Sequence, residues 1–319
     1  MSTLERRKTQ IGRNATWLRP DWPKLVEAFG DLGDVTLETS NQAVTHIKHG
    51  EFEDISFEGP VGLVLGADID LRLFTHHWKW AVAIHESPNG EATEHGVDVY
   101  DKYGRTMLEV RLGEGSNAAG LAALVDDLRV RETPEIVVEE LAQEAAMTVS
   151  DVDKETRELF AEGWRALGDT HEFFGLLREH GLERHVALEL APDGLAQKLA
   201  PLIHEELFEA AQKREAPIMI FASSGGCVQI HTGPIEVDVS EPSIYKVRGP
   251  NFGMKVGLDQ LDEAWVVKKP TVDGIVTSVE FFDVDHNLAF QVFGERKPGK
   301  PELEVWREIV AEVSQVARF

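Results

Sequence analysis

The chain has 319 residues, of which 42% are hydrophobic, so it is long enough for two domains of ordinary size with substantial cores. Its formal net charge is −24, from 56 acidic and 32 basic residues, which argues against nucleic-acid binding and against docking on anionic membranes. The single cysteine, Cys227, excludes an internal disulfide and fits a reducing compartment. No apolar run has the length of a membrane span or of a secretory signal. We therefore expect a cytoplasmic protein with a buried, unreactive thiol and no stable membrane insertion.

The first half of the chain is typical of a strand-rich unit. Residues 1–20 are polar and basic, and we expect them to be frayed. A helix is predicted from Trp22 to Phe29, because Pro23 suits a first helical turn. The strands predicted after it span 35–38, 43–47, 55–58, 61–65, 69–74, 78–84, 97–100 and 106–112, with a turn at 87–90. An alanine- and leucine-rich helix over 116–130 closes the unit, with Ser116 or Asn117 as its N-cap.

The second half repeats this pattern after an acidic connection at 132–154, in which a helix is predicted at 136–147. A helix carrying Leu159, Trp164 and Leu167 comes first. Strands are predicted at 217–222, 227–231, 235–239, 244–247, 264–267, 275–282 and 288–293. A terminal amphipathic helix at 301–318 ends the chain.

The two halves are predicted to be copies of one unit, because matching residues recur at a nearly constant offset. Residues 99–101 correspond to 281–283, an offset of 182 (283 − 101). Gly50 matches Gly233, and Arg72 matches Lys255, both at an offset of 183. This repeat predicts an α+β protein built by tandem duplication, with units at 1–147 and 148–319. Each unit is expected to be a large antiparallel sheet with helices to one side, and such proteins commonly use the cleft between their copies.

The stretch 167–181, LGDTHEFFGLLREHG, predicts a short helix with His171 in its first turn. Asp169 is the expected N-cap, and Glu172 lies three residues on, which is the capping-box spacing. The positive end of the helix dipole disfavours protonation of a histidine there. Neutral imidazole is the form that ligates metals, although an ordinary surface histidine is the commoner outcome for such a pattern.

Common catalytic signatures are absent from the sequence, including a Walker loop, a Rossmann glycine fingerprint, GxSxG and HExxH. His76 and His77 are predicted in a strand, where neighbours point to opposite faces and cannot share a metal. Residues 204–206, HEE, are expected on a solvated helix face. Arg72 lies between leucines in a predicted strand, so its charge needs a partner, either Asp70 or an anionic ligand.

Six segments carry a resemblance to a known family. They are GCVQIHTGP (226–234), KKPTVDGIVTSVEFFD (268–283), FGERKPGKPELEVWRE (293–308), WRALGDTHEFFGLLREHGL (164–182), DIDLRLF (68–74) and VYDKYGRTMLEV (99–110). These closely resemble the cytoplasmic hemin-degrading and haem-trafficking proteins of bacterial haem-uptake operons, the HemS/ChuS-like family. The resemblance covers roughly residues 35–319 and is strongest in the second half. It implies a tandem duplication of sheet-plus-helix units, with haem bound in a cleft beside the C-terminal unit.

Residue by residue, the resemblance implies a haem site. His171 matches the proximal ligand of the haem iron, and Arg72 matches the arginine of the N-terminal half that reaches the haem. The other implied contacts are Arg184 and Arg296 around the haem edge and propionates, Phe221 and Phe293 in the pocket wall, and His46 as a second, N-terminal histidine. The set suits iron protoporphyrin IX, which needs an axial donor, a flat apolar slot and cations for two propionates. Phe293 replaces a tyrosine of well-known members and Lys255 a frequent histidine, changes expected to affect oxygen chemistry more than haem binding.

Two roles for the haem complex remain open at this point. As an enzyme, the protein would open the haem ring with oxygen and electrons from a reductase, because it has no flavin or nicotinamide motif of its own. As a carrier, it would hold haem and deliver it to a separate haem oxygenase. Both roles need the same ligand and arginines, and either suits a monomer or a dimer. A third possibility, a structural domain without ligand, would leave His171 as a surface residue.

Overall fold

The computed structural model describes residues 3–85, 95–131, 135–141, 146–241, 243–297 and 299–316. Its strands in the first half are β1 (Ala15–Leu18), β2 (Val35–Ser40), β3 (Val44–Gly50), β4 (Ile55–Glu58), β5 (Val61–Leu65), β6 (Asp70–Phe74), β7 (Trp78–Ile84), β8 (Gly96–Asp101) and β9 (Thr106–Leu112). Those in the second half are β10 (Ala196–Leu199), β11 (Ile218–Ser223), β12 (Cys227–Gly233), β13 (Glu236–Glu241), β14 (Ile244–Gly249), β15 (Phe252–Gly257), β16 (Leu261–Thr271), β17 (Gly274–Asp283) and β18 (Leu288–Gly294). The helices are α1 (Thr3–Gln10), α2 (Trp22–Phe29), α3 (Ala118–Leu128), α4 (Lys154–Arg165), α5 (Glu172–Glu179), α6 (Arg184–Glu189), α7 (His204–Lys213) and α8 (Glu304–Val316).

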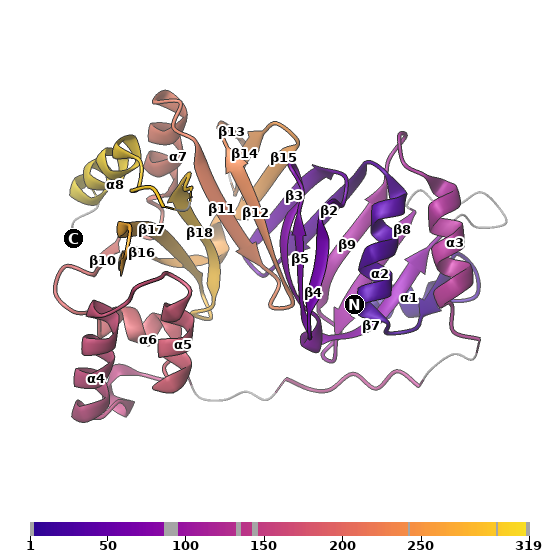
Figure 1. The fold of residues 1–319 in the computed structure, drawn as a ribbon, viewed down its shortest axis with the longest axis horizontal. Helices are drawn as coiled ribbons and strands as arrows, with labels where there is room; N and C mark the ends of the chain where they lie inside the picture. Colours follow the sequence, from indigo (N-terminus) through magenta and orange to yellow (C-terminus); the bar gives the residue numbers. More distant parts are fainter. Residues whose placement is uncertain are drawn as a thin grey trace.

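Two nine-stranded antiparallel sheets form the body of the molecule (Figure 1). Sheet A has the order β1-β7-β8-β9-β2-β3-β15-β14-β13, and sheet B has the order β10-β16-β17-β18-β11-β12-β6-β5-β4. The expected duplication of sheet-plus-helix units is confirmed, because the two orders correspond strand for strand. The structure adds that the units exchange a three-stranded segment, so β4–β6 complete the sheet of the second half and β13–β15 complete that of the first.

The exchanged strands close the two main cores. In one core, α2 and α3 pack on β2, β8 and β9 together with β5 and β6 of the other sheet. In the second core, α7 and α8 pack on β11, β17 and β18 together with β14 and β15. Each core therefore draws strands from both sheets, and burial of these apolar faces holds the two halves together.

Smaller clusters cover part of the outer faces, which point away from the main cores. Helix α1 packs on the outer face of sheet A, where Leu4 joins a cluster with Trp17 of β1 and Trp80 of β7. Helices α4–α6 pack on β16 and β17 of sheet B through Trp164 and Trp265. Four further strands of sheet B, β18, β11, β12 and β6, carry half-buried side chains on this outer face. That strip is where sheet B presents apolar surface beside α5.

Three expectations about local structure are wrong. Of residues 1–20, which were expected to be frayed, the described ones form α1 and β1, and Arg7 is 2% exposed, with its Nε 2.6 Å from an oxygen of Asp98. Residues 135–141 form no helix, and the N–H of Glu139 bonds the carbonyl of Lys102, so packing on the first unit overrides helix propensity. His204 is fully buried, with its ring 4.7 Å from that of Tyr245.

The remaining local predictions divide between confirmation and correction. Asn117 is the N-cap of α3, and its side chain accepts a bond from the N–H of Gly120, as expected. His76 and His77 lie in a 3-10 turn at Thr75–His77 rather than in a strand, and their rings are 4.1 Å apart. The turn predicted at 87–90 and the last residues of the predicted terminal helix lie outside the described residues. Among the described residues, no helix is long and apolar enough to cross a membrane.

Candidate functional site

His171 lies at the N-terminal end of α5, and its side chain is 94% exposed. The carboxylate of Asp169 accepts the backbone N–H of His171 at 2.7 Å, and the same oxygen lies 2.6 Å from Nδ1 of the ring. These two bonds lower the pKa of Asp169, so the carboxylate is ionised and accepts the proton of Nδ1. The imidazole is therefore held in one orientation with Nε2 as its free ring nitrogen, which is the arrangement of a metal-ligating histidine.

The start of α5 differs from the prediction. The helix begins at Glu172, so His171 occupies the N-cap position and the expected cap at Asp169 is two residues too early. Glu172 does bond backbone N–H groups that precede the helix, as a capping box requires, since its Oε2 accepts those of Gly168 at 2.8 Å and Asp169 at 3.2 Å. The Asp169 carboxylate, freed from capping, turns to the ring of His171 instead.

The outer face of sheet B gathers several predicted site residues. The strand register places Phe221 of β11 opposite Gln291 of β18, and Asp70 of β6 opposite Ile230 of β12. Residues two apart on a strand share a face, so Phe293 and Arg72 lie on this face as well. The rings of Phe221 and Phe293 meet edge to face at 5.1 Å. These side chains form an apolar floor with a cation at one edge.

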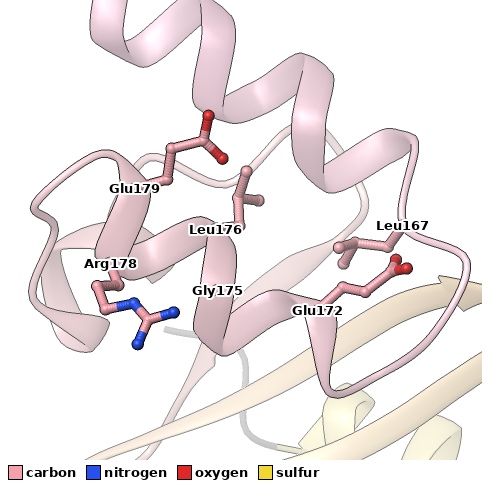
Figure 2. A pocket seen from close by; sticks show the side chains of 6 residues that line it. All are labelled: Leu167, Glu172, Gly175, Leu176, Arg178 and Glu179. Carbon is pink, nitrogen blue, oxygen red and sulfur yellow. The ribbon is translucent and has the colours of Figure 1, made fainter.

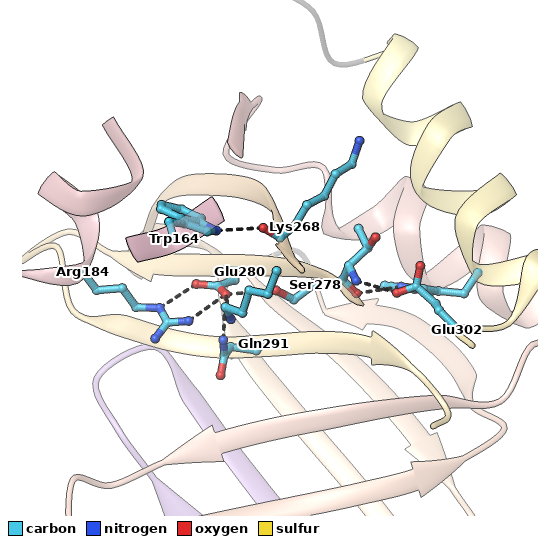
Figure 3. A network of polar contacts seen from close by, with 10 residues as sticks. Trp164, Arg184, Lys268, Ser278, Glu280, Gln291 and Glu302 are labelled. Atoms are coloured by element: carbon cyan, nitrogen blue, oxygen red, sulfur yellow. Dashed lines mark hydrogen bonds and ion pairs between the residues drawn. The ribbon is translucent and has the colours of Figure 1, made fainter. Parts of the chain in front are cut away.

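A buried ionic network, shown in Figure 3, lies on the same face of sheet B beside this floor, because the register pairs Gln291 with both Phe221 and Glu280. Glu280 is fully buried and accepts bonds from Arg184 Nε at 2.7 Å and Nη2 at 2.8 Å. It also accepts bonds from Ser278 at 2.9 Å, Gln291 at 2.8 Å and Lys269 at 3.3 Å. Burial would raise the pKa of Glu280, but the charges of Arg184 and Lys269 outweigh it and hold that pKa far below its usual range. The guanidinium of Arg184 is thus committed to Glu280 rather than free for a ligand.

Lys269 links this network to the aromatic rings of the floor. Its ammonium lies 4.9 Å from the ring centre of Phe173 on α5 and 5.9 Å from that of Phe293. Burial, only partly offset by Glu280, lowers its pKa to about 8. The network therefore fixes α5, α6 and β18 relative to one another and keeps positive charge beside the floor.

Two other predicted arginines, Arg72 and Arg296, differ in whether their guanidinium groups already have partners. Arg72 pairs with Asp70 and donates to the carbonyl of Leu71, which confirms the local ion pair as its present partner. Its side chain is nevertheless 35% exposed on the outer face. Arg296 has a buried Nε without a hydrogen-bond partner among the described residues, and its charge helps to lower the pKa of Asp169. Arg296 therefore lies near His171 with hydrogen-bonding capacity to spare.

His46 is not brought to this site. It is fully buried on the inner face of β3, and its ring packs 4.9 Å from that of Phe252. Burial holds the pKa of His46 well below the usual value, and the neighbouring His231 and Lys48 lower it further. The implied role of His46 as a haem contact does not fit this environment, because a ligand would have to part the two sheets to reach it. Lys255, the counterpart of Arg72, is exposed on sheet A.

An open recess lies between α4 and α5 (Figure 2). Leu167 and Leu176 line it together with Glu172, Arg178 and Glu179. Its two carboxylates repel an anionic ligand, and Glu172 is occupied with the start of α5. This recess does not suit a ligand that carries carboxylates.

The residues that sequence reasoning missed are those that position the site residues. Glu280, Lys269 and Gln291 belong to the network, and Asp169 orients His171. One signal was available for Glu280. It lies at offset 182 from Asp98, the buried partner of Arg7, so both copies place an acidic residue inside an apolar strand.

Fold and site together define a class: a duplicated two-sheet protein with an exposed, carboxylate-oriented histidine beside an apolar, cation-flanked sheet face. Comparison with known proteins gives the family. Residues 1–128 and 181–313 match the haemin-degrading HemS.ChuX domain, and the chain belongs to this family. His171 lies between the two matched ranges, in the segment that joins the repeats.

Individual relatives match along nearly the whole chain. The hemin transport protein HmuS of Yersinia pestis is 31% identical over 98% of this chain and 89% of its own length. Holo-PhuS, a heme-binding protein from Pseudomonas aeruginosa, is 37% identical with a TM-score of 0.90, covering 100% of this chain and 91% of that one. The structure of ChuS, described as an E. coli heme oxygenase, is 28% identical with a TM-score of 0.87, covering 98% and 93%. The two solved relatives share the fold, and this chain covers 89–93% of the length of all three.

Proposed function

We propose that this protein binds haem on the outer face of sheet B, with Nε2 of His171 as the axial ligand of the iron, and serves haem uptake. The observation that carries the proposal is the exposed His171 imidazole, whose Nδ1 is held by Asp169. A histidine oriented by a carboxylate has its tautomer fixed and its basicity as a ligand raised. Membership of the family and the haem-binding relatives support the same ligand.

The described residues fit haem in shape and charge. Phe221 and Phe293 offer flat apolar surface to the macrocycle. Arg296, with its unpartnered Nε, and Arg72, half exposed beside Asp70, are the groups available to two propionates or to a distal water. Arg184 acts indirectly, by neutralising Glu280 so that its carboxylate beside the floor is compensated.

The direct test is titration of haem into the purified protein, followed by its Soret absorbance. His171→Ala is expected to change the spectrum and to weaken binding at least tenfold, and Asp169→Asn to weaken it about 10–100-fold through the lost orientation. His49→Ala is the matched control, because His49 is an exposed histidine of the first unit. An unchanged spectrum and affinity in His171→Ala would sink the assignment.

We further propose that the bound haem is degraded oxidatively in the cytoplasm, with electrons from an external reductase. Haem would supply the redox chemistry of ring opening, while this chain would supply the axial nitrogen, the apolar floor and, on the same sheet face, Arg72 as a hydrogen-bond donor. The heme oxygenase described for the relative ChuS supports this role. The alternative, a carrier that passes haem to a separate oxygenase, is favoured by the 94% exposure of His171, which leaves the ligand open to exchange.

A turnover assay separates the two roles. The haem complex is given ascorbate or a reductase under oxygen, with catalase present because free peroxide destroys haem without an enzyme. Loss of the Soret band with formation of a bilin product and release of iron supports degradation. A haem spectrum that persists through the assay refutes degradation and leaves the carrier role.

A further inference from the structure

We propose that this chain carries a separate site for a divalent transition metal such as Zn²⁺, formed by Asp262, Glu263 and His286. One ligand atom from each of the three side chains lies within 4.8 Å of the others. Zinc bonds of about 2.0–2.2 Å place neighbouring ligand atoms about 3–4 Å apart, so small side-chain rotations would close the site. The site is at one end of β16 and β17 and uses none of the proposed haem ligands.

A β-bulge brings the two carboxylates together. The pairing of β16 with β17 shifts register between Leu261 and Glu263. In a regular strand, Asp262 and Glu263 would point to opposite faces. The bulge sets two residues of β16 against one of β17 and re-aims a side chain, so that adjacent residues can both supply a ligand.

Glu263 is already oriented as a ligand. Its Oε2 accepts a hydrogen bond from Trp265 Nε1 at 2.9 Å, which leaves Oε1 for the site. Oε1 lies 3.8 Å from Nδ1 of His286 and 2.8 Å from the ammonium of Lys198. Burial would raise the pKa of Glu263, but Lys198 and Trp265 outweigh it, so the carboxylate is ionised. Trp265 plays the part of the outer hydrogen-bond partner that metal-ligating carboxylates usually have.

His286 contributes a nitrogen that has no other use. Its Nδ1 is buried and has no hydrogen-bond partner among the described residues, although the side chain as a whole is 37% exposed. The ring stacks on that of His185 at 4.8 Å and 17°, which fixes its orientation. A site of one imidazole nitrogen and two carboxylates suits zinc or a similar metal better than magnesium or calcium.

The first repeat shows that the fold does not require these residue types. The hairpin after β8 has the same turn, because Asp101 and Asp283 both accept backbone N–H groups two and four residues on. At the left-handed position of that turn, the first copy has Gly104 (φ +75°), whereas the second has His286 (φ +61°). A non-glycine residue at this position costs on the order of 1 kcal/mol, so His286 occupies it despite the preference of the backbone for glycine.

The β-bulge of the second repeat also has a counterpart in the first repeat. The pairing of β7 with β8 shifts register between Trp78 and Trp80, so Lys79 and Trp80 occupy the places of Asp262 and Glu263. Equivalent backbone positions therefore carry three metal ligands in the second copy and none in the first.

The ammonium of Lys198 competes with a metal ion for Glu263, and this competition provides a further test. Its ammonium occupies the Oε1 side of Glu263, but its side chain is 45% exposed and free to move into solvent. A bound cation must displace it. Removing this charge without removing a ligand should therefore tighten metal binding.

The experiment titrates Zn²⁺ into the full-length, haem-free protein in competition with a chromophoric chelator and repeats the melting curve with and without Zn²⁺. Glu263→Gln and His286→Gly are expected to lose one equivalent of bound Zn²⁺ and the associated rise in Tm, whereas Lys198→Met is expected to bind severalfold more tightly. His286→Gly should fold, because glycine occupies this turn position in the first repeat. Asp285→Asn, one residue away on the same hairpin, is the matched control.

Zinc binding at other histidines, such as the adjacent His76 and His77, is common to all variants and cancels in the difference. Equal stoichiometry and affinity in the unsubstituted protein and His286→Gly would overturn the site. Binding by Lys198→Met that is no tighter than in the unsubstituted protein would also overturn it, because the metal would then not use Oε1 of Glu263. Loss of the same equivalent in Asp285→Asn would overturn the assignment to these three residues.

Discussion

Glu280→Gln is the substitution for which the structure gives the clearest energetic expectation. The carboxylate is fully buried and receives donors from Arg184, Lys269, Ser278 and Gln291. A glutamine keeps the volume but removes the charge and turns an NH₂ group toward existing donors. Breaking a buried ion pair by removing one partner typically costs about 3–5 kcal/mol, and we expect a loss of that size in the free energy of unfolding at pH 7.

The pH dependence identifies the cause of the loss. Lys269 has a native pKa of about 8, below the ordinary lysine value of 10.5. Between these values the unfolded state binds more protons than the native state, so stability rises as pH increases through this window. A difference of about 2.5 pKa units corresponds to about 3 kcal/mol. Glu280→Gln removes the anion that stabilises the charged form of Lys269, so the native pKa of Lys269 should be lower in the variant. The rise of stability with pH should therefore begin at a lower pH.

Urea unfolding at pH 7 and pH 9.5 measures both effects. Glu280→Gln leaves Arg184 and Lys269 without their anion. The double variant Glu280→Gln/Lys269→Met should recover part of the loss in stability, because one of these two unpaired cations is gone. Glu308→Gln is the control, since its partner Arg214 lies 3.1 Å away at the surface and such pairs contribute about 0–1 kcal/mol. A loss below about 1 kcal/mol for Glu280→Gln, or no recovery in the double variant, would refute the reasoning.

Three further predictions follow from backbone geometry and burial. A Cβ at Gly96 (φ +157°) would lie 1.9 Å from the carbonyl oxygen of Val110, so Gly96→Ala should lower stability by more than about 3 kcal/mol in thermal melts. Gly253→Ala, where nothing lies within 4 Å, should change stability by less than about 1 kcal/mol, and equal effects would contradict the steric argument. Burial lowers the pKa of His231 to about 3, so stability should fall as pH drops below 6.5, by about 2 kcal/mol at pH 5 from this group, and His231→Phe should flatten the urea-unfolding profile. Burial raises the pKa of the Cys227 thiol to about 12, so thiol reagents should label it only as fast as the protein unfolds.

Much of the fold could be predicted from the sequence because its signals are local. Alternation of apolar and polar residues predicted most strands, and four of them, β4, β5, β7 and β9, have the predicted bounds. The offset of 182–183 predicted the duplication, which the strand orders confirm. His171 stood out through its short capped helix, although the cap lies two residues from where local spacing placed it.

The features that the sequence did not predict share a physical cause, because each depends on a contact made far along the chain. Helix α1 is held through the pairing of Arg7 with Asp98, 91 residues away, which no local pattern contains. His46 shares the alternation of an ordinary strand, and only the packing of one sheet on the other decides that it is buried. The resemblance implied Arg184 as a contact of the haem edge or propionates, and its bond to Glu280, 96 residues away, is contained in no local pattern.

The sequence by itself determined the repeat, most elements, the family and the histidine that we propose as the haem ligand, because each is written in neighbouring residues or in a fixed offset. Tertiary structure alone decided the rest. The exchange of β4–β6 and β13–β15 depends on which sheet edges meet. The convergence of Asp262, Glu263 and His286 depends on a bulge and a turn that close against each other. Long-range pairing of strands sets both, and that information is distributed over the whole chain rather than held in any one segment.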